Sequence, residues 1–568
     1  MFGTYLGCRA GAALRSGGSR FPIMPLKAKV INPAFAGRAQ MATASNVPPK
    51  GISYAQTENI KELESDEKED VLFNTLYGVR TIELNRPAKL HSLNGSMIRK
   101  IVPRLQEWSK SDMANVIIIK GSGAKAFCAG GDVVALAEDN TKGPEGQARS
   151  TDYFGLEYKL DHLIATYQKP YIAFMDGITM GGGVGLSIHA PFRIATERTV
   201  FAMPETTIGF FPDVGASFFL PRMAGSVGTY LALTSERLKG VNAFYAGIAT
   251  HYIHSTSLPA LEKRLAELRF KDFENLEQRA QLINSTIEEY CTGLPHDEPI
   301  FISGELRKAI DRNFSKASIS EIIAGLEGDI AVLKAKAAEV GLDDVEIQIG
   351  EWLEKTLTTL HQRSPTAVHV ALRQMRIGKD WSITETFQRE YQIAAKFMRH
   401  PDFTEGVHSL LIRGKNSKEA SPPQWQPKSL EDIKPEDKIA DPFFQVEGSQ
   451  RIKLLSDRDY NEYPFKFGVP REKEVEKFVR QGGKSKFQVI NHFFQATEGK
   501  QGVKEVVSEI IERKTTKSEA GHLLWEQEQV ASPTSSDGRM KRRRNTKMSK
   551  WQNRAQIHHH VMEAYRIE

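Results

Sequence analysis

"ITMGGGVGLSI", residues 178–188, places four glycines within five positions between two apolar stretches. Each glycine inside a helix or strand costs roughly 0.5–1 kcal/mol relative to alanine, so core packing alone gives no reason for them. A bare backbone lets amide N–H groups face a ligand directly, and a helix that starts there favours negative charge. The stretch has neither a Walker sequence nor GxGxxG spacing. It predicts a site for a phosphate or for a carbonyl oxygen that becomes an oxyanion.

Strand-like segments surround this stretch at regular intervals. The apolar runs "NVIIIKG" (115–121) and "KPYIAFMDG" (169–177) predict buried strands, and the alternating "VRTIELNRP" (79–87) predicts a half-buried one. "TVFAMPE" (199–205) returns to a strand after a helix that breaks at Pro191. Repeated strand, loop and helix units predict an α/β domain. Apolar residues at i, i+3 and i+4 then predict helices at 258–268, 319–340 and 364–375.

A second glycine-containing loop precedes the first. "KAFCAGGDV" (125–133) follows a predicted strand and presents bare backbone at Gly130 and Gly131. Two such loops after neighbouring strands can each direct one N–H group at a single oxygen, which is the geometry of an oxyanion hole. Cys128 lies inside this motif with no histidine nearby in sequence, so a packing role is favoured over a nucleophilic thiol.

Several motifs together resemble the crotonase superfamily and, within it, the 3-hydroxyisobutyryl-CoA hydrolases. They are "KAFCAGGD", "KPYIAFMDGITMGGGVGLSIH", "FAMPETTIGFFPDVGASFFLPR" and "LKGVNAFYAGIATHYI", and the resemblance covers roughly residues 60–430. It implies a fold of repeated ββα turns with a helical C-terminal part. It also implies an acyl-CoA substrate whose thioester oxygen is held by the backbone amides of Gly131 and Gly182. The resemblance implies no metal, and no cofactor beyond the CoA that belongs to the substrate.

Three acids are candidates for the chemistry. Glu205 follows a predicted strand, and Asp213 comes eight residues later beside aromatic residues. Two carboxylates near an apolar pocket can be driven to different pKa values, which gives one ionised group and one proton donor. The resemblance assigns both to the catalytic site. Glu157 lies on the apolar face of a predicted helix, where it either pairs with an arginine or, as the resemblance implies, contacts substrate.

One departure from the wider superfamily bears on the reaction. Enoyl-CoA hydratases carry a second catalytic glutamate just after the glycine loop, and the matching residue here is Gly185. This favours thioester hydrolysis over hydration or isomerisation of an enoyl-CoA. Glu205 then either attacks the thioester carbon directly or activates a water, and Asp213 holds the substrate hydroxyl, the leaving group or the lytic water.

The composition and the amino terminus limit the classes of protein to which this chain can belong. The chain has 568 residues, 40% of them apolar, a net charge of +6 and only three cysteines, which excludes a disulfide framework. No apolar run is long enough to span a membrane. Residues 1–57 contain no Asp or Glu but several Arg and Lys, which predicts a mitochondrial transit peptide over 1–45 or, alternatively, a disordered basic tail. We expect the ββα core at 46–310 and the helical part at 311–440.

An extension, residues 441–568, continues beyond the resemblance to the hydrolases. Its short amphipathic segments, including 520–530, are near the minimum length for a helix, so they need a surface to pack on. The rest is expected to be partly disordered, and a basic tail ends the chain. In fungal mitochondria a protein that resembles these hydrolases belongs to the small ribosomal subunit, so the extension predicts contacts with its proteins and rRNA. The RNA-contact candidates are Arg542, Arg543, Arg544, Lys547, Lys550 and Arg554.

Two hypotheses therefore stand side by side. The first is a mitochondrial enzyme that hydrolyses 3-hydroxyisobutyryl-CoA in valine breakdown. The second is a small-subunit component of the mitochondrial ribosome built on the same scaffold. They are compatible, because every motif residue that catalysis requires is present.

Overall fold

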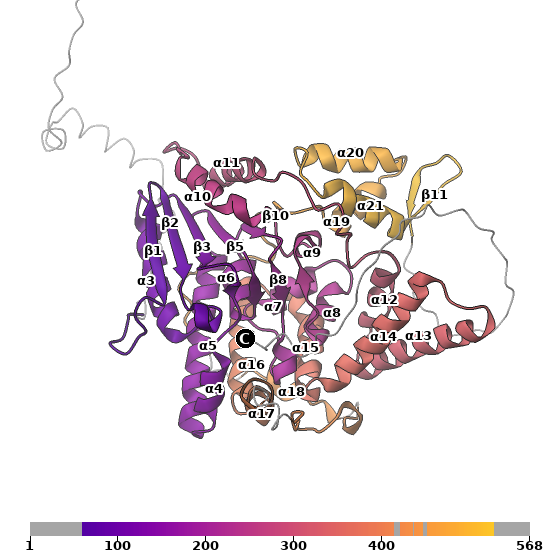
Figure 1. Ribbon diagram of the computed structural model, residues 1–568, viewed down its shortest axis with the longest axis horizontal. Coiled ribbons are helices and arrows are strands. Elements are labelled where there is room, and N and C mark those ends of the chain that lie inside the picture. The colour runs from indigo at the N-terminus through magenta and orange to yellow at the C-terminus, as the bar shows by residue number, and fades with distance from the viewer. Residues whose placement is uncertain (1–59, 414–420, 435–436, 447–450, 527–568) are drawn as a thin grey trace, which may run out of the picture. The chain divides into compact units, whose positions relative to one another are not determined.

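The computed structural model describes residues 60–413, 421–434, 437–446 and 451–526 (Figure 1). All of them belong to one compact unit, residues 58–568. The predicted transit peptide lies outside the described residues. No helix within the described ranges is both long and apolar enough to cross a membrane.

A six-stranded sheet forms one layer of the core. Its first two strands are antiparallel and the rest are parallel. All five residues of β5 (Tyr171–Met175) are buried, as expected for a parallel strand covered on both faces. The strand order is β1 (Val71–Leu76), β2 (Val79–Leu84), β3 (Val116–Gly121), β5, β7 (Phe192–Ala195) and β10 (His251–Tyr252).

A second, four-stranded sheet produces the repeated ββα turns that the sequence predicts. Its strands follow strands of the first sheet along the chain: β4 after β3, β6 after β5 and β8 after β7. A helix comes after each of these pairs. The elements are β4 (Ala126–Cys128), β6 (Ile178–Met180), β8 (Val200–Ala202), β9 (Leu238–Lys239), α4 (Val133–Asn140), α5 (Pro144–Ala165), α6 (Gly182–Ile188), η2 (Glu205–Ile208) and α7 (Ala216–Phe219).

Helices dominate the chain after β10. The three helices predicted from periodicity are present as α10 (Leu258–Ala266), α13 (Ile319–Glu339) and α15 (Pro365–Ile377). Ser364 caps α15, since its hydroxyl accepts from the Ala367 amide at 3.1 Å. The other helices are α3 (Gly95–Lys110), α8 (Val227–Thr234), α9 (Val241–Tyr245), α11 (Leu276–Glu288), α12 (Gly304–Phe314), α14 (Asp344–Gln362), α16 (Ile383–Phe397), α17 (Pro401–Val407), η6 (His408–Ile412) and α18 (Asp441–Phe444).

Within the extension, residues 451–470 form an irregular segment that we call the strap. Phe467 of the strap stacks on Phe192 of β7 at 4.8 Å between ring centroids. Three short helices follow, α19 (Glu472–Val479), α20 (Lys486–Ala496) and α21 (Val503–Lys514), and they lie together in Figure 1. Residues 520–530 were expected to form another amphipathic helix, which is wrong for 520–526, the part of this range that the structure describes. Instead β12 (Leu523–Trp525) pairs antiparallel with β11 (Thr515–Lys517).

The short helices obtain their packing surface from this chain. Val475, Val489 and Val507, one from each helix, are fully buried in one apolar cluster, which also contacts Tyr245 of α9. The prediction that these helices need a surface to pack on is confirmed for these valines, and this chain itself provides that surface.

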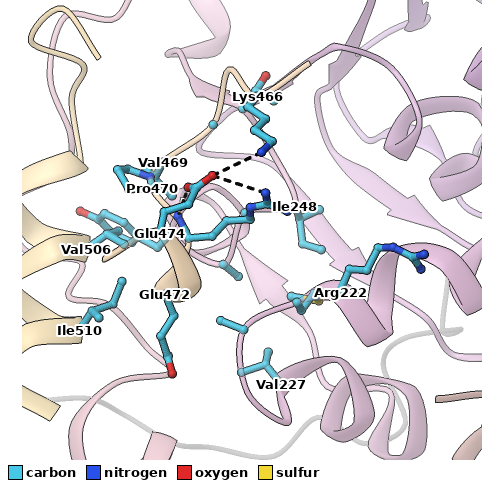
Figure 2. A pocket seen from close by; sticks show the side chains of 18 of the residues that line it. Arg222, Val227, Ile248, Lys466, Val469, Pro470, Glu472, Glu474, Val506 and Ile510 are labelled. Atoms are coloured by element: carbon cyan, nitrogen blue, oxygen red, sulfur yellow. Dashed lines mark hydrogen bonds and ion pairs between the residues drawn. The ribbon is translucent and has the colours of Figure 1, made fainter. Parts of the chain in front are cut away.

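A cavity of about 320 Å³ remains between the extension and the core (Figure 2). Its acidic residues are paired with cations. Glu472 bonds Arg513 at 2.7 Å, and Glu474 lies 3.7 Å from Lys466. None of the predicted site residues lines this cavity.

Candidate active site

Both glycine loops and all three predicted acids meet at a different cavity, of about 410 Å³. The loops come from the second sheet, since one follows β4 and the other follows β6. The acids come from α5 and from the segment after β8. The predicted site residues in its lining are Gly131, Gly182, Glu157, Glu205 and Asp213.

The two predicted oxyanion donors lie side by side. A Cβ atom placed on Gly182 would lie 3.4 Å from the amide nitrogen of Gly131. Neither amide N–H donates to an acceptor anywhere in the described part of the chain. Two unpaired backbone donors at one cavity wall can bind one oxygen, which is the arrangement that stabilises an oxyanion.

Close approach explains why the loop is so rich in glycine. Gly181 has φ +44°, a left-handed conformation that other residues rarely adopt. A Cβ on Gly183 would lie 2.2 Å from the carbonyl oxygen of Cys128, so a side chain there would separate the two loops. Cys128 is fully buried, and burial raises the pKa of its thiol to about 12, which is consistent with a packing role.

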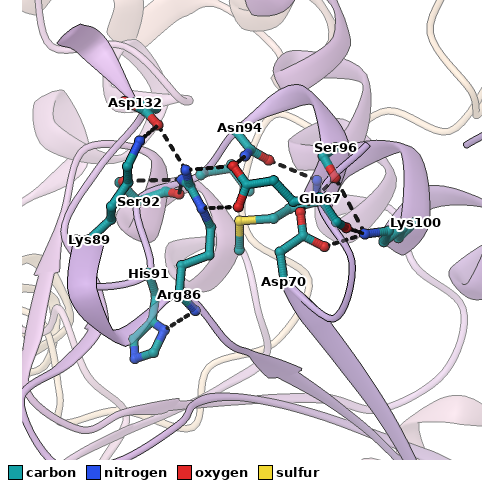
Figure 3. Close-up of polar contacts among 12 residues, drawn as sticks. Glu67, Asp70, Arg86, Lys89, His91, Ser92, Asn94, Ser96, Lys100 and Asp132 are labelled. Carbon is teal, nitrogen blue, oxygen red and sulfur yellow. Dashed lines mark hydrogen bonds and ion pairs between the residues drawn. The ribbon is translucent and has the colours of Figure 1, made fainter. Parts of the chain in front are cut away.

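A buried arginine fixes the glycine loop at residues 125–133 (Figure 3). The guanidinium of Arg86 donates to the carboxylates of Asp132 at 3.0 Å and Glu67 at 2.9 Å. The Leu93 amide donates to the Gly130 carbonyl at 2.7 Å. The Asp132 amide in turn donates to the Leu93 carbonyl at 2.9 Å. Burial raises the pKa of Asp132, but hydrogen bonds from Lys89 and Arg86 hold it below its usual value. The backbone on both sides of the Gly131 amide is therefore anchored.

Glu157 extends from α5 into the cavity wall. It is 2% exposed, and its Oε1 has no hydrogen-bond partner in the structure. No arginine or lysine forms an ion pair with it among the described residues, so the alternative of an arginine pair is wrong there. Burial raises its pKa well above the usual value, and the nearby charge of Asp213 raises it further. The carboxyl group is available to a ligand.

Glu205 and Asp213 form the second part of the acid cluster. Glu205 begins η2 directly after β8, is 5% exposed, and leaves Oε2 without a partner. Burial, followed by the Asp213 charge, raises its pKa well above the usual value. Burial also raises the pKa of Asp213, but only to about 7, because the Tyr158 hydroxyl donates to its carboxylate. The environment therefore pushes the pKa of Glu205 further than that of Asp213, so Asp213 is the first of the two to ionise as pH rises.

The segment that carries Asp213 is strained and supported from several sides. Val214 has φ +53°, which costs a β-branched residue about 1–3 kcal/mol. The carboxylate of Glu390 on α16 accepts from the amides of Gly215 at 2.7 Å and Ser217 at 2.9 Å. His189 Nε2 bonds the Val214 carbonyl at 2.9 Å. Sequence reasoning missed Glu390 and His189, because nothing in the local pattern links them to residue 213.

Asp161 is another residue that sequence reasoning missed. It lies one turn after Glu157 on α5, is fully buried, and neither carboxylate oxygen has a hydrogen-bond partner. A Cβ on Gly185 would lie 2.7 Å from Asp161 Oδ2. The space beside Gly185 is thus filled by a carboxyl group from another helix. The i, i+4 spacing of Glu157 and Asp161 was the available signal.

Some predicted features cannot be placed. The RNA-contact candidates Arg542, Arg543, Arg544, Lys547, Lys550 and Arg554 lie outside the described residues. No group of three or more His, Cys, Asp or Glu side chains arranged for a metal ion occurs within the described ranges.

Comparison with known proteins identifies a family and several relatives that this chain resembles. A family model described as enoyl-CoA hydratase/isomerase matches residues 79–444. A Neurospora crassa protein named small ribosomal subunit protein mS47 is 55% identical, over 92% of this chain and 98% of its own. A Gallus gallus protein named 3-hydroxyisobutyryl-CoA hydrolase, mitochondrial, is 42% identical, over 69% of this chain and 92% of its own. The crystal structure of a carnitinyl-CoA dehydratase from Mycobacterium thermoresistibile aligns with a TM-score of 0.54 at 29% identity, covering 67% of this chain and 98% of its own.

Proposed function

The chain belongs to the enoyl-CoA hydratase/isomerase family, and on that basis we propose that it hydrolyses 3-hydroxyisobutyryl-CoA in mitochondria. The observation that supports this best is one cavity lined by two glycines with unpaired amides, Gly131 and Gly182, and by the Glu205 and Asp213 pair. The name of the Gallus gallus relative, a mitochondrial hydrolase of this substrate, supports the substrate and the compartment.

In this proposal the two amides bind the thioester oxygen and stabilise its developing negative charge. Glu205 passes its proton to Asp213 and attacks the thioester carbon. The C–S bond breaks, and Asp213 protonates the departing CoA sulfur. Water then opens the resulting anhydride as Asp213 takes one of its protons, which regenerates the Glu205 carboxylate and releases the free acid. A single displacement by a water that Glu205 activates uses the same groups and is equally consistent with the geometry.

The remaining site groups orient the substrate. Glu157 bonds the hydroxyl group of the acyl chain, because its buried carboxyl has an oxygen without a partner beside Gly182. Phe154 and Phe210 provide an apolar wall for the acyl chain. No cofactor takes part, since CoA is itself the leaving group.

Release of free CoA from the purified chain tests this proposal. A thiol reagent follows CoA release, and Glu205→Gln should abolish it while circular dichroism and the melting temperature stay close to those of the wild type. Turnover that persists in Glu205→Gln would remove Glu205 from the mechanism. A wild-type chain with no CoA release would refute the hydrolase proposal.

A second role is favoured by the extent of one similarity. The match to the Neurospora crassa mS47 protein covers 92% of this chain and therefore includes much of the extension, whereas the hydrolase from Gallus gallus matches 69%. We propose that the chain is also a component of the mitochondrial small ribosomal subunit, bound through residues 441–568 to its proteins and rRNA. Co-sedimentation of the full chain with small subunits tests this role, and a chain that stays at the top of the gradient contradicts it.

A further inference from the structure

The active-site segment is connected to the extension through a single histidine. His189 follows α6 directly and is 3% exposed. Its Nε2 lies 2.9 Å from the carbonyl oxygen of Val214, the residue after Asp213. Its Nδ1 lies 3.0 Å from the hydroxyl oxygen of Tyr463, which belongs to the strap. Tyr463 lies beyond residue 444, where the match to the family model ends.

The direction of these two hydrogen bonds follows from the chemistry. A carbonyl oxygen only accepts, so His189 Nε2 carries the hydrogen and donates to Val214. Nδ1 of the same neutral ring is then an acceptor, and the Tyr463 hydroxyl donates to it. Burial lowers the pKa of His189 to about 4, so the ring is neutral under ordinary conditions and this tautomer is retained. The Val214 carbonyl therefore sets the tautomer, and the Tyr463 hydroxyl, which donates to Nδ1, holds the ring in the orientation that reaches Val214.

The contact matters because the held segment is strained and tightly packed. Val214 has φ +53° and Gly215 has φ +89°. A Cβ on Gly215 would lie 2.2 Å from His189 Nε2, so the imidazole lies directly against this turn. Without support, a strained turn relaxes toward ordinary backbone angles. Such relaxation would move the Asp213 carboxyl group away from the substrate.

We propose that Tyr463 is a positioning residue for Asp213 and acts through His189. The extension thus contributes to the geometry of the catalytic site as well as enlarging the chain. The catalytic consequence rests on the proposed hydrolase function. The structural consequence, which is order in the 212–217 segment, holds whether or not the chain is a hydrolase.

The chain provides a matched control on the same strap. Tyr460 is close to Tyr463, with ring centroids 5.8 Å apart, and both rings pack against Phe218. The Tyr460 hydroxyl, however, is buried without a hydrogen-bond partner in the structure. Tyr460→Phe and Tyr463→Phe remove the same atom from two neighbouring rings that both pack against Phe218. Only the second removes the contact with His189.

Hydrogen exchange tests the structural consequence without requiring activity. In the full-length chain, mass spectrometry follows exchange in peptides that cover residues 210–218. Tyr463→Phe should speed exchange there about three- to tenfold, as expected for the loss of one neutral hydrogen bond. Tyr460→Phe should leave the rate unchanged. Equal rates in the two variants would overturn the proposal.

Kinetics of CoA release test the catalytic consequence. Tyr463→Phe should lower kcat about three- to tenfold with KM within about twofold, because substrate binding is retained while Asp213 is misplaced. In an Asp213→Asn background the same substitution should have no further effect, since the group that it positions is gone. An unchanged kcat, or equal losses in both backgrounds, would overturn the proposal. A wild-type chain that releases no CoA counts against the hydrolase function alone, and the exchange rates then decide this inference.

Discussion

The hydroxyl of Tyr158 donates a 2.7 Å hydrogen bond to Oδ2 of Asp213, and both groups are buried. This bond stabilises the ionised carboxylate, whose pKa burial raises to about 7. Tyr158→Phe should raise that pKa further, by about one unit, since a hydrogen bond to a charged group is removed. If Asp213 must be ionised for turnover, the acidic limb of the kcat/KM profile moves to higher pH and the rate at pH 7 falls.

Tyr171→Phe is the control for this prediction. The Tyr171 hydroxyl is also buried but has no hydrogen-bond partner in the structure. Its removal should leave the profile in place. An acidic limb that stays near its wild-type position in Tyr158→Phe would show that a group other than Asp213 governs it.

Asp213→Asn should make the protein more stable, and increasingly so as pH rises. The folded-state pKa of Asp213, about 7, lies above the ordinary value of 3.8, so the native chain binds more protons than the unfolded chain between these two pH values. Folding stability is therefore lost as pH rises through this window, and the neutral amide avoids the loss. The gain should reach a few kcal/mol by pH 8 and be small near pH 4. Thermal melts at pH 5 and pH 8 measure it.

Asp132→Asn should behave in the opposite way. Hydrogen bonds from Lys89 and Arg86 outweigh burial and depress the pKa of Asp132, so its stabilisation is present above the unfolded pKa and lost as pH falls. The substitution should destabilise the chain at pH 8 and much less at low pH. Equal pH slopes for the Asp213 and Asp132 variants would contradict both assignments.

Gly182→Ala should inactivate the site with little effect on folding. The new Cβ would lie 2.6 Å from Glu157 Oε1, the end of a side chain that can move, and 3.4 Å from the Gly131 amide. A methyl group there obstructs the oxyanion site, so kcat should fall about 10²–10³-fold. Gly183→Ala should instead destabilise the fold, because its Cβ would meet the backbone of Cys128 at 2.2 Å. Melting temperatures and CoA release separate the two effects, and similar behaviour of both variants would contradict this reasoning.

The sequence was sufficient to predict those parts of the fold and site that a local pattern of residues determines. The apolar run before Gly177 predicted β5, and the glycine spacing predicted two loops with free amides that the fold brings together. The oxyanion donors, Glu205 and Asp213 could be proposed because they lie in motifs that resemble the family, whereas Glu157 was proposed from its place on the apolar face of a helix and from the same resemblance.

The groups that support the site could not be predicted in this way. Glu390 on α16 and His189 after α6 bond the 213 segment, and Tyr463 of the strap bonds His189 across a separation of 274 residues. Such contacts depend on tertiary packing and leave no mark in hydrophobic periodicity. The error at 520–530 has a similar origin, because strand pairing with Thr515–Lys517 outweighs helical periodicity there.

Gly185→Glu alone should not produce an enoyl-CoA hydratase. Its Cβ would lie within 2.9 Å of the Asp161 carboxyl group, so the glutamate meets a buried acid rather than open space. The variant should melt at a lower temperature and show no hydration of an enoyl-CoA. Adding Asp161→Ala removes the obstructing carboxyl and should recover much of the melting temperature. A stable single variant would contradict the packing argument.

Removal of the basic tail should separate the two proposed roles. A chain truncated after Glu526 keeps every described element, including the strap with Tyr463, but loses all six RNA-contact candidates. It should hydrolyse 3-hydroxyisobutyryl-CoA at the wild-type rate, whereas its association with small ribosomal subunits should weaken.

For the full chain, that association should also fall steeply with salt, because arginine and lysine contacts to phosphates release counterions. A chain truncated after residue 440 should lose the association and also hydrolyse the substrate more slowly, since it lacks the strap with Tyr463 as well. Undiminished co-sedimentation of the chain that ends at Glu526 would show that α19 to α21 and the core, rather than the tail, hold the subunit.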